Sequence, residues 1–230
     1  MASGFMAVLP EQQQGEIKLN KQSKYEDFVL MALFAAVILV LALTPVGYIR
    51  IGLISATLIH VPVIIGSVIL GPKRGAVLGG IFGLTSFIMN FMAPGVLSFV
   101  FCPFIPVPGT SRGNPLAIVI CFLPPILVGV VPYYVYRLMK KTAKNEYFPL
   151  LAGGAAGSLV NTLLVMGLIY LIFKNAYAAA TGVDSNAVTA AIIGVVLMNG
   201  VPEAVAAALI NAAVCKPLLR FREKNTVRGE

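Results

Sequence analysis

Apolar residues occur in six long runs, and short segments with charged residues, proline or glycine separate these runs. None of the runs alternates apolar and polar residues with a period of two, so helices are predicted and not the strands of a membrane barrel. A helical run of about 20 residues crosses a hydrocarbon core of about 30 Å. The pattern therefore predicts an all-α membrane protein with six transmembrane helices. Their expected bounds are residues 28–48, 53–70, 75–92, 116–136, 148–173 and 187–214.

The second predicted span, residues 53–70, is an apolar segment between charged residues. As a helix its 18 residues would be about 27 Å long, close to the thickness of the hydrocarbon core. Arg50 precedes it, and the turn at residues 71–75, which contains Lys73 and Arg74, ends it. His60 is its one ionisable side chain, and we expect a neutral imidazole that is hydrogen-bonded within the bundle.

The segment between the third and fourth spans, residues 93–115, contains five prolines and three glycines and cannot form a continuous helix. A loop of this length is usually functional or disordered. Its apolar side chains, among them Phe99, Phe101 and Phe104, argue against disorder. We expect this loop to fold over the outer end of the bundle as a lid. The alternative is an interfacial segment that covers no ligand.

The composition supports a membrane location, with 58% hydrophobic and 11% charged residues against about 25% charged in soluble proteins. One six-helix bundle uses nearly all of the 230 residues and leaves no room for a soluble catalytic or nucleotide-binding domain. The chain has no Walker motif, so any energy input would come from a partner or a gradient. Three widely spaced cysteines predict neither a disulfide framework nor a metal site.

Membrane topology explains the net charge of +8 better than nucleic-acid binding does, because the basic residues flank the apolar runs. Of the 17 Lys and Arg residues, 14 lie in the two tails and in the second and fourth connections. The other three are Arg50, Arg112 and Lys174. By the positive-inside rule, both tails, residues 1–27 and 215–230, are cytoplasmic.

Polar residues inside the predicted helices are the candidates for a binding site. Glu203 follows Asn199 by one helical turn, and Pro202 between them can open the backbone locally. The pair either lines a polar cavity or forms a structural hydrogen bond from a neutral glutamic acid. Asn161 could reach the same cavity together with Ser158 or Thr162, but contacts between helices explain it equally well.

Two arginines on the predicted outer side, Arg50 and Arg112, could meet a substrate as it arrives. A guanidinium group suits a carboxylate or a phosphate, although either residue could be a solvated loop charge. Arg112 lies beside Asn114 in the apolar loop, and we favour it of the two. In the first span, Ala32 and Ala36 form a small-residue face that allows close helix packing, within the chain or with a partner.

Catalysis finds little support, because the chain has no nucleophile elbow, no HExxH motif and one histidine. An intramembrane enzyme that uses His60 and Glu203 remains an alternative class. A carrier that works without partners is another. No metal or cofactor is expected.

From Phe28 to about Arg222 the chain resembles the substrate-binding S components of energy-coupling factor (ECF) vitamin transporters. The resemblance rests on the topology, on the Ala32-xxx-Ala36 face and on two stretches of sequence. These are GYIRIGLISATLIHVPVIIGSVILGPKRGAVLGGIFGLTS and NGVPEA.

The resemblance implies a vitamin-binding subunit in the plasma membrane of a bacterium. A transmembrane coupling subunit would contact Ala32 and Ala36, and two cytosolic ATPases would drive a toppling motion that carries the vitamin inward. By the same resemblance, a site near the outer face would draw on Arg50, Asn90, Arg112, Asn114, Asn161, Asn199 and Glu203.

The chain resembles most the members assigned to pantothenate, a small anion with a carboxylate, two hydroxyls and an amide. Riboflavin or folate would favour aromatic stacking, and the chain has no Trp, but Tyr48 and the phenylalanines of the loop could stack. These vitamins therefore remain alternatives.

Overall fold

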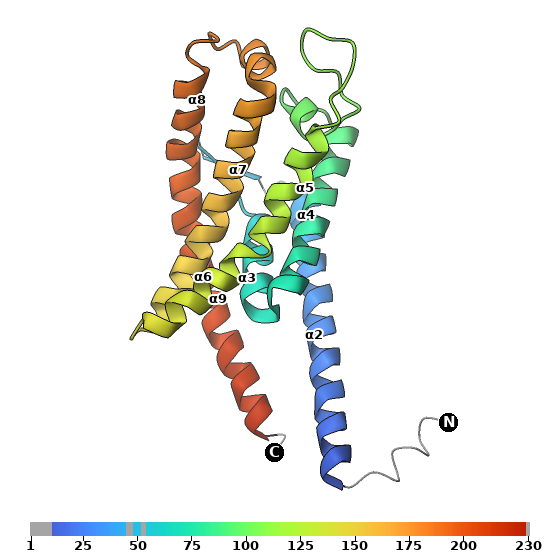
Figure 1. Cartoon of the computed structure of the whole chain (residues 1–230), viewed down its shortest axis with the longest axis vertical. Coiled ribbons are helices and arrows are strands. Elements are labelled where there is room, and N and C mark those ends of the chain that lie inside the picture. Colours follow the sequence, from blue (N-terminus) through green and yellow to red (C-terminus); the bar gives the residue numbers. More distant parts are fainter. Residues whose placement is uncertain (1–10, 45–47, 52–53, 229–230) are drawn as a thin grey trace, which may run out of the picture.

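The computed structural model describes residues 11–44, 48–51 and 54–228, and these form a bundle of helices that run along one long axis (Figure 1). The order along the chain is α2 (Glu11–Leu43), β1 (Tyr48–Ile51), β2 (Ile54–Thr57), α3 (His60–Leu70), α4 (Pro72–Met92), the 3₁₀ turn η2 (Ser98–Val100), α5 (Ala117–Val128), α6 (Val131–Thr142), α7 (Tyr147–Thr181), α8 (Val188–Val195), the π-helical η3 (Val196–Gly200) and α9 (Val201–Arg228).

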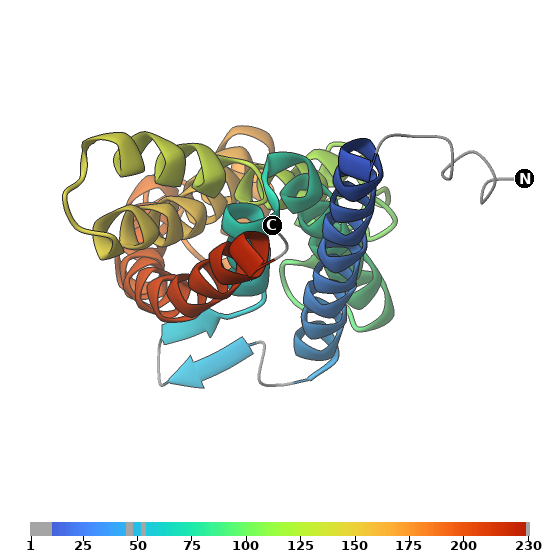
Figure 2. The ribbon, with the colours of Figure 1, turned by 90° about the horizontal axis from the view of Figure 1, so that it is seen from below.

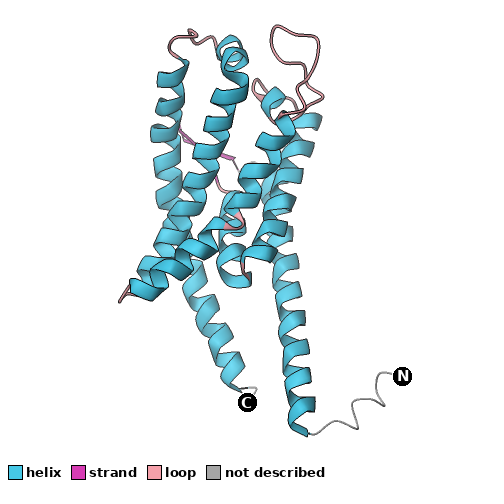
Figure 3. Cartoon of the chain, viewed as in Figure 1, coloured by secondary structure: helices cyan, strands magenta, loops and turns pink. Residues whose placement is uncertain are grey.

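Five segments of the described chain are long and apolar enough to cross a membrane. They are Tyr25–Leu43, Pro72–Met92, Ala117–Thr142, Tyr147–Thr181 and Val188–Arg222. The start of α2, the turn from α3 to α4 and the end of α9 all lie toward the lower end of the molecule in Figure 1, and we call this the basic end. The 93–115 loop and the connection from α7 to α8 lie at the opposite end (Figure 3).

The prediction of one continuous helix over residues 53–70 is wrong. Residues 54–57 form the second strand of an antiparallel hairpin, in which Arg50 pairs with Ser55, and α3 begins only at His60. The β-branched residues of the hairpin favour extended backbone. α3 has 11 residues, about 16 Å of helix, and all of them are buried, so protein surrounds α3 and it need not match the lipid thickness.

The hairpin lies on one side of the bundle, next to α9, when the molecule is seen along its axis (Figure 2). β2 contacts both η3 and α9. The predicted first span, residues 28–48, ends earlier than expected, because α2 stops at Leu43 and β1 begins at Tyr48.

The predicted fourth span, residues 116–136, is broken into α5 and α6 at Gly129 and Val130. Prolines inside a helix predict a kink, but Pro124 and Pro125 both lie within α5 and the break follows one turn later. There the amide of Gly129 donates to the carbonyls of Pro125 and Ile126, at 3.1 and 3.0 Å. α4 also passes so close that a Cβ atom on Gly75 would overlap the carbonyl group of Gly129.

The predicted sixth span, residues 187–214, is also not one regular helix. The wide turn of η3 separates α8 from α9, and α9 continues to Arg228. π-helical turns add a residue to a helix and frequently occur at functional sites. The predicted fifth span, 148–173, corresponds to α7, which continues to Thr181 after a kink at Phe173.

Two apolar clusters hold the bundle together. One surrounds α3 and includes Ile64 and Leu78, and the other lies at the opposite end, where Phe99 packs edge-to-face on Phe173 with ring centroids 5.7 Å apart. Phe99 and Val100 are 2% and 0% exposed, so this part of the 93–115 loop is buried against the bundle, whereas Phe104 is 70% exposed.

Candidate functional site

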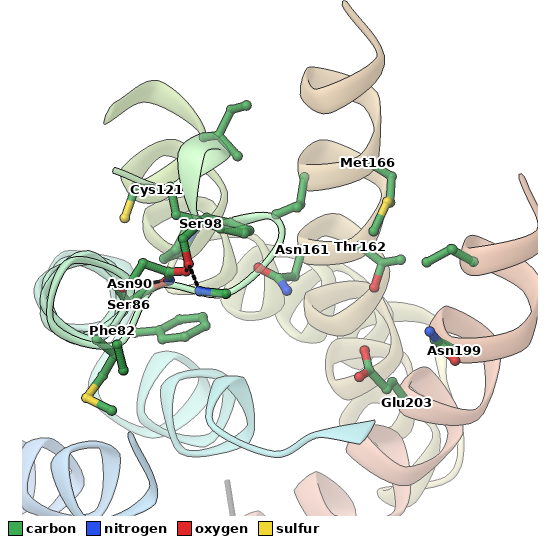
Figure 4. Close-up of a pocket in the computed structure, with 18 residues that line it drawn as sticks. Phe82, Ser86, Asn90, Ser98, Cys121, Asn161, Thr162, Met166, Asn199 and Glu203 are labelled. Atoms are coloured by element: carbon green, nitrogen blue, oxygen red, sulfur yellow. Dashed lines mark hydrogen bonds between the residues drawn. The ribbon is translucent and has the colours of Figure 1, made fainter. Parts of the chain in front are cut away.

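A cavity of about 480 Å³ lies between α4, α5, α7 and the junction of α8 with α9, and the 93–115 loop forms part of its wall (Figure 4). Its apolar lining includes Phe82, Phe101 and Ile120. Its polar lining consists of Ser86, Asn90, Ser98, Asn161, Thr162, Asn199 and Glu203. This combination of an apolar body and a few convergent polar groups is typical of a small-molecule site.

One wall of the cavity ties the loop to α4. The hydroxyl of Ser98 donates to Oδ1 of Asn90 at 2.6 Å and accepts from the amide of Gly95 at 2.8 Å. Nδ2 of Asn90 donates to the carbonyl of Ser86 at 2.8 Å. These bonds hold the Asn90 side chain in place and fix the start of the loop to α4.

The facing wall comes from α7, η3 and α9. Asn161, Thr162, Asn199 and Glu203 converge there in Figure 4. Glu203 is 7% exposed, and Oδ1 of Asn199 is buried and accepts no hydrogen bond from any described residue. A buried carbonyl oxygen without a donor is costly, which makes Asn199 suited to accept a hydrogen bond from a ligand.

The electrostatic character of the cavity is unusual for an anion site. No Lys, Arg or His side chain is among the described residues that line it, and Glu203 is its one carboxyl group. Carboxylate and amide oxygens accept hydrogen bonds from hydroxyls, and amide nitrogens donate to carbonyls. The inner cavity therefore suits a ligand portion that carries hydroxyl and amide groups.

The structure brings together four of the seven residues predicted for the site, namely Asn90, Asn161, Asn199 and Glu203. Asn114 instead accepts from the amide of Leu116 at 2.9 Å, and Arg112 is exposed on the loop; neither lines the cavity. Arg50 belongs to β1, and its side chain lies outside the described part of the structure.

Sequence reasoning missed Ser86 and Ser98 in the cavity. The spacing of Ser86 four residues before Asn90 could have indicated a shared helix face, whereas no local signal placed Ser98. His60 is 1% exposed and does not line the cavity, and neither ring nitrogen has a hydrogen-bond partner among the described residues. The hydrogen bond predicted for it within the bundle is therefore not found.

Comparison with known proteins identifies the family. Residues 26–215 match the family described as ECF transporter, substrate-specific component. The chain belongs to this family. It is accordingly a multi-pass protein of the bacterial plasma membrane that serves transport, and the enzyme alternative is removed.

Two relatives are named for the same substrate. The chain is 38% identical over 200 residues to the pantothenic acid transporter PanT of Lactococcus lactis subsp. cremoris. This match covers 84% of this chain and 100% of that protein. It is 28% identical over 218 residues to the pantothenate transporter PanT of Leuconostoc mesenteroides, at 91% and 99% coverage.

Among solved structures, the S component for biotin from an ECF-type ABC transporter matches with a TM-score of 0.44 and 17% identity. The match covers 85% of this chain and 93% of that one.

Proposed function

We propose that this chain is the pantothenate-binding S component of an ECF-type importer, and that the 480 Å³ cavity is its vitamin site. The observation that carries the proposal is the 38% identity to a protein named a pantothenic acid transporter, over the full length of that protein. The chemistry of the cavity supports it independently, because its acceptors and amides match the hydroxyl and amide groups of pantothenate.

The distribution of charge suggests how pantothenate lies in the cavity. Its dihydroxy end points inward, where Glu203 and Asn199 accept from the hydroxyls, and its amide meets Asn161. The carboxylate points toward the loop and away from Glu203, because two like charges in a low-dielectric site repel each other.

One of two arginines then neutralises the carboxylate. Arg112, on the exposed part of the loop, is our first choice, and Asn114 beside it positions the backbone at the start of α5. Arg50 is the second choice, because its strand pairs with β2, and β2 contacts η3, which carries Asn199.

The 93–115 loop acts as a lid in this proposal. Its apolar part is anchored by Phe99, and Ser98 links it to Asn90 in the cavity wall. Closure of the exposed part over the vitamin would exclude water and bring Arg112 to the carboxylate.

Members of this family work with a transmembrane coupling component and ATPases. We propose that the coupling subunit packs against α2, where Ala32 and Ala36 are exposed beside larger exposed apolar residues such as Leu33 and Val40. Both tails lie in the cytoplasm, as the basic end requires under the positive-inside rule. ATP-driven toppling of the bundle then delivers the vitamin inward.

Equilibrium binding of pantothenate to the purified chain, measured by isothermal titration calorimetry, tests the proposal. We expect one site with submicromolar affinity, and no competition by riboflavin, folate or biotin at tenfold excess. Absence of pantothenate binding, or displacement by one of the other vitamins, would contradict the assignment.

A further inference from the structure

A second cavity, of about 240 Å³, opens at the basic end between α6, the start of α7 and α9. Its lining combines four cationic side chains with one carboxylate, which leaves three net positive charges around a small volume. The cations are Lys140, Lys144, Lys216 and Arg220, and the carboxylate is Glu146. This cavity shares no lining residue with the proposed vitamin site, and the exposed alanines of α2 do not line it.

The cavity is organised before any ligand arrives. Oε2 of Glu146 lies 3.4 Å from Nζ of Lys216 and 3.1 Å from a guanidinium nitrogen of Arg220. Nζ of Lys216 also lies 3.4 Å from the centroid of the Tyr147 ring, and the side chain of Lys216 is 17% exposed. Glu146 and Tyr147 thus hold two cations from α9 in place at the beginning of α7.

The remaining two cations have no carboxylate partner in the described part of the chain. Lys140 lies over the ring of Tyr136, 5.7 Å from its centroid, and within the described residues neither Lys140 nor Lys144 forms an ion pair. The first turn of α7 borders the same cavity, and the amide groups of a helix N-terminus add partial positive charge. The electrostatics of the cavity therefore favour a compact anion.

The surroundings favour an anion that carries apolar chains. Leu150 and Leu219 form part of the cavity wall. Beside the cavity, Leu138 of α6 and Phe148 of α7 are 61% and 54% exposed. Tyrosines and basic residues that meet an apolar helix surface are typical of the level of the lipid headgroups. Basic pockets between transmembrane helices on the cytoplasmic side can bind lipid headgroups.

We propose that this cavity binds the headgroup phosphate of an anionic phospholipid of the cytoplasmic leaflet. Lys216 and Arg220 contact the phosphate, Lys140 and Lys144 surround it, and the acyl chains lie along the apolar surfaces of α6 and α7. The bound lipid links α9 to the connection between α6 and α7, so it stabilises the bundle at the end opposite the vitamin lid.

Intact-complex mass spectrometry of the full chain in detergent, titrated with phosphatidylglycerol or phosphatidylcholine, tests this proposal. We expect one phosphatidylglycerol to bind at least tenfold more tightly than phosphatidylcholine. The double variant Lys140→Gln/Lys144→Gln should lose at least tenfold in phosphatidylglycerol affinity, since each cation near an anionic headgroup contributes to binding.

The chain offers a matched control on the same helix. Arg137 and Lys141 are exposed residues of α6 that do not line the cavity, so Arg137→Gln/Lys141→Gln removes the same charge from the same end. This control should retain phosphatidylglycerol affinity within about twofold. Equal losses in the two double variants would show general surface attraction and overturn the site, as would no loss in either.

Inorganic phosphate separates a lipid site from a site for a free anion. We expect millimolar phosphate to leave the bound phosphatidylglycerol in place, because phosphate lacks the apolar contacts. Displacement of the lipid by phosphate would overturn the assignment to a lipid. Pantothenate affinity of each variant, measured in parallel, verifies that the bundle is folded. This check is independent of the lipid proposal.

Discussion

Arg222 of α9 forms an ion pair with Asp27 of α2, although 195 residues separate them along the chain. The second carboxylate oxygen of Asp27 accepts from Arg74 of α4, and Arg222 also donates to the carbonyl of Ile69 at 2.6 Å. Three helices therefore meet at the carboxylate of Asp27, a residue that is 8% exposed, and Arg222 joins α3 to the same cluster. This cluster joins the first and last helices of the bundle at the basic end.

Replacement of Asp27 tests the contribution of this cluster to stability. Asp27→Asn should lower the free energy of unfolding by about 1 to 3 kcal/mol, because two arginines lose their charged acceptor while solvent screens them in part. Thermal unfolding of the purified chain in detergent measures the effect. Glu26→Gln changes an exposed neighbouring carboxylate and should leave the melting temperature nearly unchanged. Equal melting temperatures of the two variants would refute a stabilising role.

The close contact between α4 and α5 predicts opposite effects for two adjacent glycines. A Cβ atom on Gly79 would lie 2.8 Å from the carbonyl carbon of Pro125, whereas nothing lies within 4 Å of one on Gly80. Gly79→Ala should therefore destabilise the bundle by about 1 to 3 kcal/mol. Gly80→Ala should stabilise it slightly, by about 0.5 to 1 kcal/mol, since alanine favours helix. Denaturant titration followed by circular dichroism would distinguish these outcomes from equal effects.

The buried carboxyl group of the cavity should determine affinity for the vitamin. Glu203→Gln preserves the shape of the side chain but weakens acceptance from hydroxyls, and we expect pantothenate binding to weaken by about 1.5 to 3 kcal/mol. Calorimetric titration measures the loss. Glu146→Gln alters a carboxylate outside the cavity and should bind the vitamin as the unmodified chain does. Unchanged affinity of Glu203→Gln would exclude the proposed contact with the hydroxyls.

The partner of the carboxylate can be identified with a pair of ligands. Arg112→Ala should weaken pantothenate binding by about 1.5 to 3 kcal/mol, but it should affect much less the binding of the alcohol analogue, which lacks the carboxylate. Lys174→Ala removes a cation from a residue that does not line the cavity and serves as the control. If Arg112→Ala binds both ligands normally, Arg50→Ala should show the selective loss. Normal binding by both variants would rule out an arginine partner.

The exposed alanines of α2 should govern association and not vitamin binding. Ala36→Leu adds bulk to the small-residue face, so assembly with the coupling subunit should fall at least tenfold, while pantothenate affinity remains unchanged. Co-purification with tagged coupling subunit measures assembly. Val37→Phe enlarges an exposed side chain that is turned by about 100° from Ala36 and should assemble normally. Loss of assembly in both variants, or in neither, would argue against this face.

The predicted site residues show where sequence reasoning works and where it stops. A spacing of four residues predicted that Asn199 and Glu203 share one helix face, where they would either line a cavity or form a structural hydrogen bond. In the structure both line the cavity. The wide turn of η3, which contains Asn199, was not predicted, because its backbone pattern has no local sequence signal. Asn114 has the polarity of a ligand contact but accepts a hydrogen bond from the amide of Leu116 just before α5, and only the path of the chain distinguishes these roles.

Local composition was enough to predict the membrane location, the helical class and the distribution of charge between the two ends. These properties follow from the transfer of each side chain between water and lipid, which depends on local composition. Only the tertiary structure decided that residues 54–57 form a strand, that α3 is a short buried helix and that α5 breaks at Gly129. Packing against other helices sets these features, so an apolar run enclosed by protein has no need to span the bilayer. The same packing brought Asn90, Asn161 and Glu203 to one cavity, although no spacing along the chain relates them.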